Sequence, residues 1–194
     1  MTAATAETKP VVARMSIPAM VRLRLTTMSV EVETLCDHKA DSALRAADAS
    51  IRRGFQQGAA SAHLRAVTLC ESLPMALRIA TSAVQHGFAE AAEVAYGRAV
   101  VLAATVPDAR FVVQAAIDQG FTVVVAAGYA RLIELAQTAD EAVSVAEAAM
   151  AVGMRALADK AFARAMQLSV LPHERRNVRH CATRNGVNLA QTVA

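Results

Sequence analysis

The sequence predicts an all-α protein, a superhelix of about four helix-turn-helix repeats with N- and C-terminal capping helices. Three observations lead to this prediction: a glycine that returns at a constant interval, columns of similar residues in phase with it, and a helix-favouring composition. Hydrophobic residues make up 55% of the 194 residues, aromatic residues make up 4%, and the chain contains 8 Gly and 5 Pro. Such an alanine-rich chain favours helices, and its apolar content is sufficient for a packed core.

The repeat is carried by several columns that agree with one another. The marker glycines are Gly54, Gly87, Gly120 and Gly153. A ring follows each of them nine residues later (His63, Tyr96, Tyr129, Phe162), and an alanine precedes each by eleven residues (Ala43, Ala76, Ala109, Ala142). Independent columns that keep one phase over four copies predict four equivalent structural units.

Each unit is predicted to be two helices joined at the glycine. In the second unit we expect one helix over residues 74–86 and another over residues 88–103. The first helices are expected to start at Asp41, Pro74, Pro107 and Asp140, with Ser72, Thr105 and Thr138 as caps. Glycine ends these helices because it adopts the left-handed conformation after a helix without steric cost.

Small residues form the inward face of the first helices. In the second unit this face holds Ala76, Ile79, Ala80 and Ala83, at the steps of one side of a helix. Such side chains let two helix axes approach to about 8 Å, and the ring of the second helix fills the space that they leave. A single hairpin would not bury both of its faces, so we expect the units to stack.

The chain is expected to divide into a flexible N-terminal tail (residues 1–12), an N-terminal capping helix (13–39), four repeats (40–172) and a degenerate C-terminal capping repeat (173–194). In the last segment Gly186 keeps the interval of the marker glycines, but Arg175 and Arg179 stand where the repeats have apolar residues. A terminal repeat whose outer face meets water needs such polar side chains.

These columns resemble the tetratricopeptide repeat, a family of αα-hairpin solenoids. The second unit matches the second-helix pattern of the family with Gly87, Phe88, Ala92, Tyr96, Ala99 and Leu102. The third unit has Val125 and Leu132 at the two alanine positions. The interval from one marker glycine to the next is one position shorter than the family's usual period of about 34 residues. The resemblance covers about residues 40–169 and implies a right-handed αα-superhelix whose first helices line the concave face.

Ankyrin repeats are the alternative with a matching period. They have about 33 residues, the same interval as the marker glycines, but their T-P-L-H-x-A pattern is absent from this chain. The columns therefore favour the tetratricopeptide-like hairpin over the ankyrin repeat.

The resemblance also implies a partner-binding groove along the first helices. Two of its columns are mostly apolar, namely Leu44, Leu77, Arg110 and Val143, and Ile51, Val84, Ile117 and Met150. Two others are mostly polar, namely Asp48, Thr81, Gln114 and Glu147, and Arg52, Gln85, Asp118 and Ala151. An apolar floor with polar edges suits a peptide or an amphipathic helix, so we expect a protein–protein interaction adaptor with a protein or peptide partner. The alternative is that the apolar columns are partly buried against neighbouring first helices or against a terminal segment.

Other interaction roles stay open. One is a structural subunit of a larger assembly or a homo-oligomer, and a secretion-type chaperone is a familiar role of short stacks like this one. A third role is to bind RNA or DNA through the basic end (Arg175, Arg176, Arg179 and Arg184 against Glu174) and the arginine column (Arg65, Arg98, Arg131, Arg164). We expect instead that the arginine column is a solvated stripe, and we do not expect a nucleic-acid partner, because residues 1–172 are neutral on balance.

Neither catalysis nor a cofactor is indicated, so we expect a binding protein and not an enzyme. The sequence has no phosphate-binding glycine loop, no G-x-S-x-G and no H-E-x-x-H. Its three cysteines (Cys36, Cys70, Cys181) contain no C-x-x-C pair and indicate neither a disulfide framework nor a metal site. No stretch of about 18 apolar residues predicts a membrane span, and residues 1–13 lack the apolar run of a signal peptide. We therefore expect a cytoplasmic protein.

Overall fold

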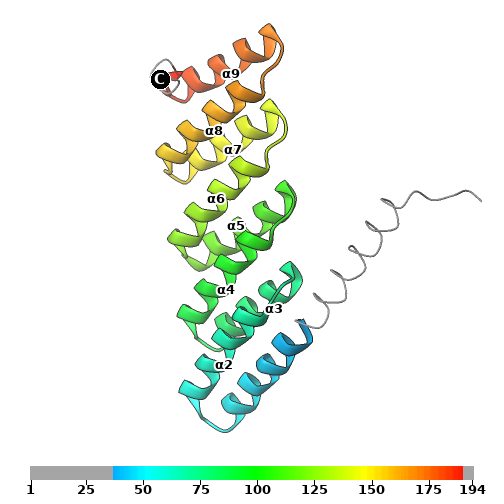
Figure 1. Cartoon of the computed structure of the whole chain (residues 1–194). Helices are drawn as coiled ribbons and strands as arrows, with labels where there is room; N and C mark the ends of the chain where they lie inside the picture. Colours follow the sequence, from blue (N-terminus) through cyan, green and yellow to red (C-terminus); the bar gives the residue numbers. More distant parts are fainter. Residues whose placement is uncertain (1–36, 190–194) are drawn as a thin grey trace, which may run out of the picture. The chain divides into compact units, whose positions relative to one another are not determined.

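The structure is a computed structural model that describes residues 37–189, all of them within one compact unit. The first described helix covers residues 37–52. It is followed by α2 (Gln56–Leu69), α3 (Leu73–Gln85), α4 (Ala89–Leu102), α5 (Val106–Gln119), α6 (Thr122–Leu135), α7 (Ala139–Ala151), α8 (Arg155–Leu168) and α9 (Pro172–Arg184). No strand occurs among the described residues, so the predicted all-α class is confirmed (Figure 1).

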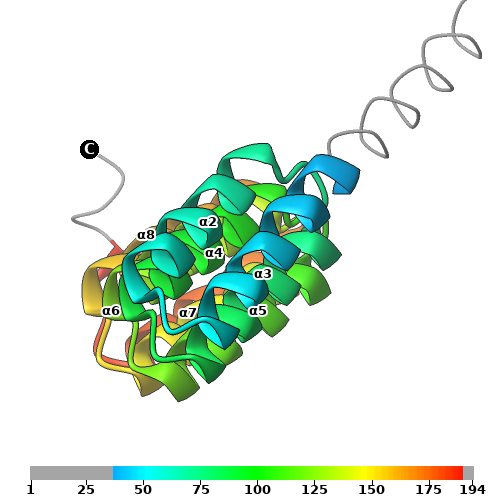
Figure 2. The ribbon, with the colours of Figure 1, turned by 90° about the horizontal axis from the view of Figure 1, so that it is seen from below.

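The helices form antiparallel pairs that stack into two rows. We name the first member of each pair an A helix (residues 37–52, α3, α5 and α7) and the second a B helix (α2, α4, α6 and α8), and α9 takes the place of a further A helix. Consecutive B helices pack against one another along one row, as Figure 2 shows for α2, α4, α6 and α8. The described unit is therefore the α-helical repeat superhelix that the regular return of the marker glycines predicts.

A glycine makes the corner of every hairpin. Gly87 has a φ of 77°, in the left-handed region where a side chain would be strained. Its N–H donates to the Val84 carbonyl at 3.1 Å, and the N–H of Phe88 donates to the Ala83 carbonyl at 2.8 Å, which are the two bonds of a Schellman motif. The other corner glycines, Gly54, Gly120, Gly153 and Gly186, have φ values of 77°, 76°, 78° and 71°, so the predicted corners are confirmed.

Three of the A helices begin where their cap residues predict. The hydroxyls of Ser72, Thr105 and Thr138 each accept a hydrogen bond from the backbone N–H three residues further on. Helices α3 and α5 carry a proline within the first turn, where its missing N–H would have no partner within the helix. Glu141 completes a capping box with Thr138 at the start of α7. The local sequence therefore fixes where these repeats begin.

The predicted start of the first A helix is wrong, because the chain is helical from residue 37 onward and Asp41 lies inside the helix. The Asp41 carboxylate pairs with Arg45, one turn later, at 2.7 Å and with Arg78 of α3. Partial burial raises the pKa of Asp41, but the hydrogen bonds and positive charges of Arg78 and Arg45 outweigh burial and lower the pKa on balance. Asp41 thus links two A helices and does not cap one.

Small residues bring the two helices of a hairpin close together. Ala80 of α3 and Ala95 of α4 are fully buried, as are the matching alanines of α7 and α8. The third hairpin reaches a close approach with a different pair: a Cβ atom on Gly128 of α6 would lie only 2.3 Å from a methyl carbon of Val113 on α5. In this hairpin the valine of α5 is larger than the alanine of the other hairpins, and the glycine of α6 leaves the space that the valine needs.

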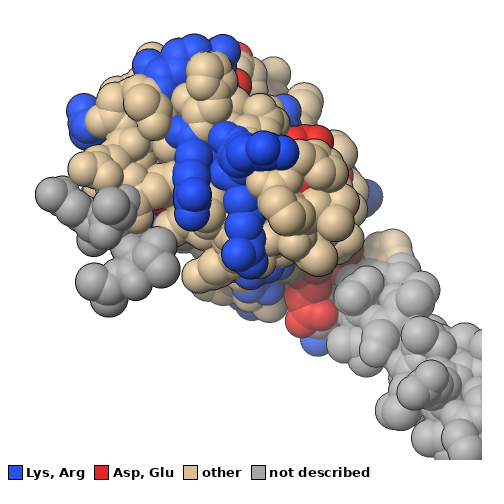
Figure 3. Space-filling view, turned by 90° about the horizontal axis from the view of Figure 1, so that it is seen from above, with Lys and Arg blue, Asp and Glu red and all other residues tan. Residues whose placement is uncertain are grey.

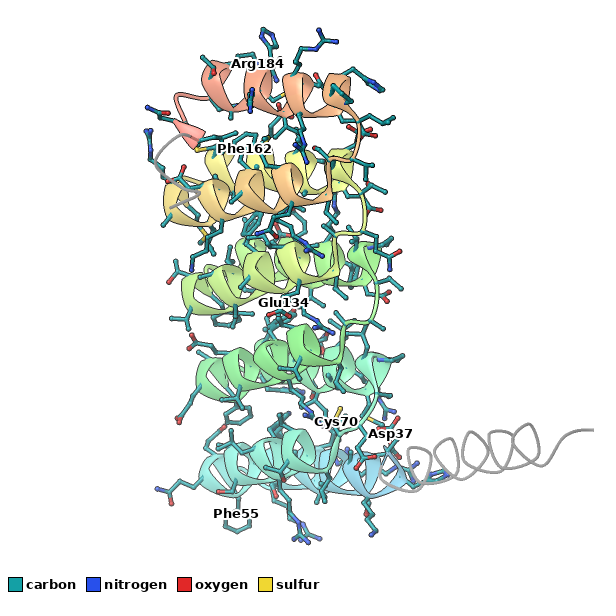
Figure 4. All side chains as sticks on the ribbon, turned by 45° about the horizontal axis from the view of Figure 1, so that its top comes forward. Asp37, Phe55, Cys70, Glu134, Phe162 and Arg184 are labelled. Carbon is teal, nitrogen blue, oxygen red and sulfur yellow. The ribbon has the colours of Figure 1, made fainter. Side chains whose placement is uncertain are left out.

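The ring column fills the space between neighbouring hairpins. Its members, His63, Tyr96, Tyr129 and Phe162, are all buried. Figure 4 shows Phe162 inside the stack. His63 is packed, as the sequence predicts: its Nε2 lies 3.1 Å from the hydroxyl of Ser82, and its ring centre lies 5.1 Å from that of Phe88. His63 therefore ties its own hairpin to the next one.

The arginine column is solvated only at its first member: Arg65 is exposed, as the sequence predicts, whereas Arg98, Arg131 and Arg164 are half-buried. Arg98 of α4 donates from Nε and Nη2 to the Cys70 carbonyl at the end of α2, at 3.1 and 3.0 Å. Arg131 of α6 makes the same two bonds, at 3.2 and 3.1 Å, to the Ala103 carbonyl at the end of α4. Each guanidinium thus caps the preceding B helix, whose last carbonyls have no partner within the helix. Arg164 of α8 differs, since its Nε is buried without a hydrogen-bond partner among the described residues.

The predicted ends of the chain lie partly outside the described residues. The described residues do not include the predicted tail (residues 1–12), the predicted capping helix up to residue 36, or residues 190–194. Residues 37–39, which the sequence assigns to the capping helix, are part of the first A helix. At the other end α9 packs against α7 and α8. Arg175 and Arg179 of α9 are exposed in columns where α3, α5 and α7 carry buried alanine or valine. This polar face is what the sequence predicts for a terminal repeat.

Candidate partner-binding site

Six of the predicted groove residues surround one hollow of about 610 Å³ between the first A helix and α3. They are Leu44, Asp48, Ile51, Arg52, Thr81 and Gln85. The structure adds Arg78, Ser82 and His86, which the sequence analysis missed. Their spacing offered a signal, because they lie nine, five and one residues before Gly87, on the side of α3 that faces the first A helix.

Apolar side chains form the floor of the hollow. Leu44 is only 3% exposed, and Ile51 is half-buried. The other apolar groove residues pack against the core: Leu77, Val84, Ile117 and Met150 are half-buried, and Val143 is buried. The apolar columns therefore contribute to the packing of the stack, which is the alternative that the sequence left open.

Charged groups without partners stand beside this floor. Within residues 37–189, neither the side chain of Asp48 nor that of Arg52 takes part in a hydrogen bond or an ion pair. They lie one turn apart on the first A helix, with Asp48 half-buried and Arg52 exposed. On the opposite wall Arg78 already pairs with Asp41, and the hydroxyl of Thr81 donates to the backbone of its own helix at 2.8 Å. The hollow thus offers an apolar floor, one free carboxylate and one free guanidinium.

The predicted residues of α5 and α7 lie outside the hollow, and the polar ones are engaged. Arg110 donates to a serine hydroxyl of α7 at 2.9 Å, and Gln114 donates to the Asp118 carboxylate at 2.8 Å. Glu147 of α7 pairs with Arg184 of α9. The bond of Arg110 crosses the gap from α5 to α7, and that of Glu147 crosses the gap from α7 to α9. The structure therefore does not gather all of the predicted residues into one site, and its unpaired charges lie at the first gap.

One hydroxyl and one imidazole meet at the wall of the hollow, where Ser82 lies against His63. This pair has a counterpart in the third hairpin, where the Tyr129 hydroxyl donates to the Ala148 carbonyl of α7 at 3.2 Å. In both cases a ring of a B helix is held by the next A helix at the same position of the repeat. Because the contact recurs, we interpret the Ser82–His63 pair as part of the packing between hairpins.

Among the other reactive side chains of the described residues, Cys70 also contributes to the packing of the stack. Cys70 is buried, its thiol donates to the Ser72 carbonyl at 3.2 Å, and burial raises the pKa of that thiol. No group of three or more His, Cys, Asp or Glu side chains among residues 37–189 is placed to hold a metal ion. The arrangement of the hollow is suited to binding through apolar contact and charge.

Comparison of the chain with protein families, with curated proteins and with solved structures gives no match. In the part of the chain that the structure describes, no helix has the length and apolar character needed to cross a membrane.

Proposed function

We propose that the protein is an interaction module that binds a segment of a partner protein in the hollow between the first A helix and α3. One observation carries the proposal: six residues assigned to a partner groove from the sequence surround this single hollow. The tetratricopeptide-like columns add support, because that family's A helices line the surface on which partners bind.

The lining of the hollow defines the kind of segment that fits. An apolar side chain would cover the floor formed by Leu44 and Ile51. Asp48 and Arg52, which are unpaired among the described residues, favour a basic residue on one side of that apolar anchor and an acidic residue on the other. The buried anchor supplies most of the affinity, while the charges at the rim set orientation and the choice of partner.

Filling the hollow should abolish binding without disturbing the fold. We expect Thr81→Arg to lose the peptides that the wild-type protein selects from a displayed random library, because Thr81 is exposed and the larger side chain occupies the ligand's space. Thr68→Arg is the matched control. Thr68 is also exposed and also bonds to its own helix at 2.8 Å, but it lies on α2, outside the hollow.

The selected peptides provide a second readout. The wild-type protein and the Thr68→Arg control should enrich an apolar residue flanked by opposite charges, and Asp48→Lys should reverse the preferred charge at one flank. If Thr81→Arg selects the same peptides as the wild-type protein, the hollow is not the binding site.

A second role, as a structural subunit, is favoured by exposed apolar residues on the B row. Val94 and Val101 of α4 and Val123 of α6 are 47%, 64% and 71% exposed. Exposed valines of this kind suit contact with a second copy or with another subunit. Light scattering across a concentration series discriminates: a mass that rises for the wild-type protein but not for Val101→Lys supports assembly, whereas a constant monomer mass excludes self-assembly.

A further inference from the structure

In each complete hairpin the B helix covers the same columns of its A helix. Gly128 of α6 lies against Val113 of α5, seven residues before the corner glycine. The two helices run antiparallel, so the A-helix column one turn before that of Val113 faces the B-helix column one turn after that of Gly128. Both columns hold buried alanine or valine in α3, α5 and α7. In α9 the same columns hold Arg179 and Arg175, and both are exposed.

The place that a B helix would take on α9 is not filled by described residues. The corner at Gly186 is formed as in the other hairpins, with a φ of 71°. Residues 187–189 follow it, and a hollow of about 760 Å³ lies beside them, with Met166, Arg179 and Leu189 among its lining residues. Apolar side chains and an arginine thus face the same open space.

The surface around this place is basic. Helix α9 carries four arginines and one acidic residue, namely Arg175, Arg176, Arg179 and Arg184 against Glu174. Figure 3 looks onto this end of the unit, where Lys and Arg side chains gather. The Glu174 carboxylate is already engaged, because it accepts hydrogen bonds from two backbone N–H groups of the turn before α9, at 2.9 and 3.0 Å. No free carboxylate of α9 balances the arginines.

The arginines of α9 are not equally available. Arg184 pairs with Glu147. Arg175 donates from Nε to the Ser169 carbonyl at the end of α8, at 3.1 Å, and so gives α8 the cap that α2 and α4 receive from the arginine column. Among the described residues, the side chain of Arg179 takes part in no hydrogen bond or ion pair, while its backbone carbonyl accepts a hydrogen bond from the Thr183 hydroxyl at 2.9 Å. The guanidinium of Arg179 and the terminal nitrogens of Arg175 remain for a ligand.

We propose that this face of α9 binds an acidic helix of a partner protein, in the place that a B helix takes on α3, α5 and α7. Two acidic side chains four residues apart on that helix face Arg179 and Arg175, and a small residue three positions before the first acid lies opposite Ala182. Paired arginine and carboxylate groups supply selectivity. The apolar side of the partner helix enters the hollow lined by Met166 and Leu189.

A nucleic acid fits this face less well. The arginines lie on a single helix roughly 20 Å long, and two of the four are already bonded to the protein. The hollow beside Arg179 has apolar lining residues, which a phosphate backbone does not use. Residues 187–194 of the chain contain no Asp or Glu, so they do not supply the complementary charge.

The probes for a test can be taken from the protein's own helix α4. The test peptide is Ala89–Leu102 with Ala95→Glu and Ala99→Glu, which places carboxylates at the two positions that face the arginines. The reference peptide keeps both alanines. Both peptides carry Gly97→Ala to raise helicity and Arg98→Gln to remove a repelling charge. Each is labelled and titrated with the full chain while fluorescence anisotropy is recorded.

We expect the glutamate peptide to bind at least about tenfold more tightly than the reference peptide, with an affinity that falls as salt rises. Arg179→Ala restores the residue that α3 and α7 carry in this column and should abolish the preference. Arg179→Glu should reverse it in favour of a peptide with Ala95→Lys. Arg53→Glu, an equal change of charge at an exposed site of the first hairpin, should leave the preference intact.

Equal binding of the two peptides, or an equal loss in Arg53→Glu, would overturn the proposal. Tighter binding of a single-stranded oligothymidine of about twenty nucleotides, released by Arg179→Glu, would also overturn it and identify a nucleic-acid site. Circular dichroism of the Arg179 variants distinguishes lost binding from unfolding, and Arg179→Ala keeps the test decisive if the charge reversal disturbs the fold.

Discussion

Replacing Gly128 by alanine is expected to destabilise the protein by about 1–2 kcal/mol, although alanine is the better helix former. The added Cβ atom would lie 2.3 Å from a methyl carbon of Val113. Either α5 and α6 must separate or Val113 must leave its rotamer, at a cost of about 1–3 kcal/mol. The gain in helix propensity, about 1 kcal/mol, offsets only part of this cost.

The matched control is Gly97→Ala in α4. Nothing lies within 4 Å of the Cβ atom that Gly97 would gain, so propensity acts alone. We therefore expect the free energy of unfolding to rise by up to about 1 kcal/mol. The two glycine variants should change stability in opposite directions, because only one of them sits at a helix–helix contact.

A double-mutant cycle identifies the cause of the Gly128 effect. Val113→Ala alone should cost about 2 kcal/mol, because it leaves space beside Gly128. Val113→Ala combined with Gly128→Ala recreates the alanine pair of the second hairpin (Ala80 and Ala95) and should come within about 1 kcal/mol of the wild-type protein. Urea unfolding followed by circular dichroism measures all four proteins. Additive losses in the double variant would show that Val113 does not set the helix spacing.

Removing the guanidinium of Arg131 is expected to have the second large effect. Arg131→Met leaves the Ala103 carbonyl, at the end of α4, without the two donors that cap it. Ala103 is fully buried, so we expect the free energy of unfolding to fall by about 1–3 kcal/mol. The free energy of unfolding of Arg131→Lys should lie between those of the wild-type protein and Arg131→Met, because an ammonium group lacks the planar fork that reaches the carbonyl with two nitrogens.

Arg164→Met provides the control within the same column. The Nε atom of Arg164 is buried without a hydrogen-bond partner among residues 37–189, so its removal should be neutral or stabilising. Thermal and urea unfolding of the three variants measure the difference. Equal losses in Arg131→Met and Arg164→Met would attribute the effect to the aliphatic stem of arginine and not to its hydrogen bonds.

The candidate site could be predicted from the sequence only in part. The predicted columns supply six of the residues that line the hollow. They did not identify which gap would keep free charges. Arg110 finds a hydroxyl on the next A helix, whereas Arg52 finds no partner among the described residues. That difference depends on the residue that the next hairpin places opposite.

The sequence by itself determined the period, the glycine corners, the threonine and serine caps and the buried rings. Each of these depends on the backbone preference of one residue or on neighbours within a turn, and repetition made each visible. Tertiary structure alone decided the roles of the arginine column and of Asp41. Arg131 and its carbonyl are 28 residues apart, and Asp41 and Arg78 are 37 apart. Such pairs meet only because one hairpin packs on the next, which brings together residues that lie far apart in the chain.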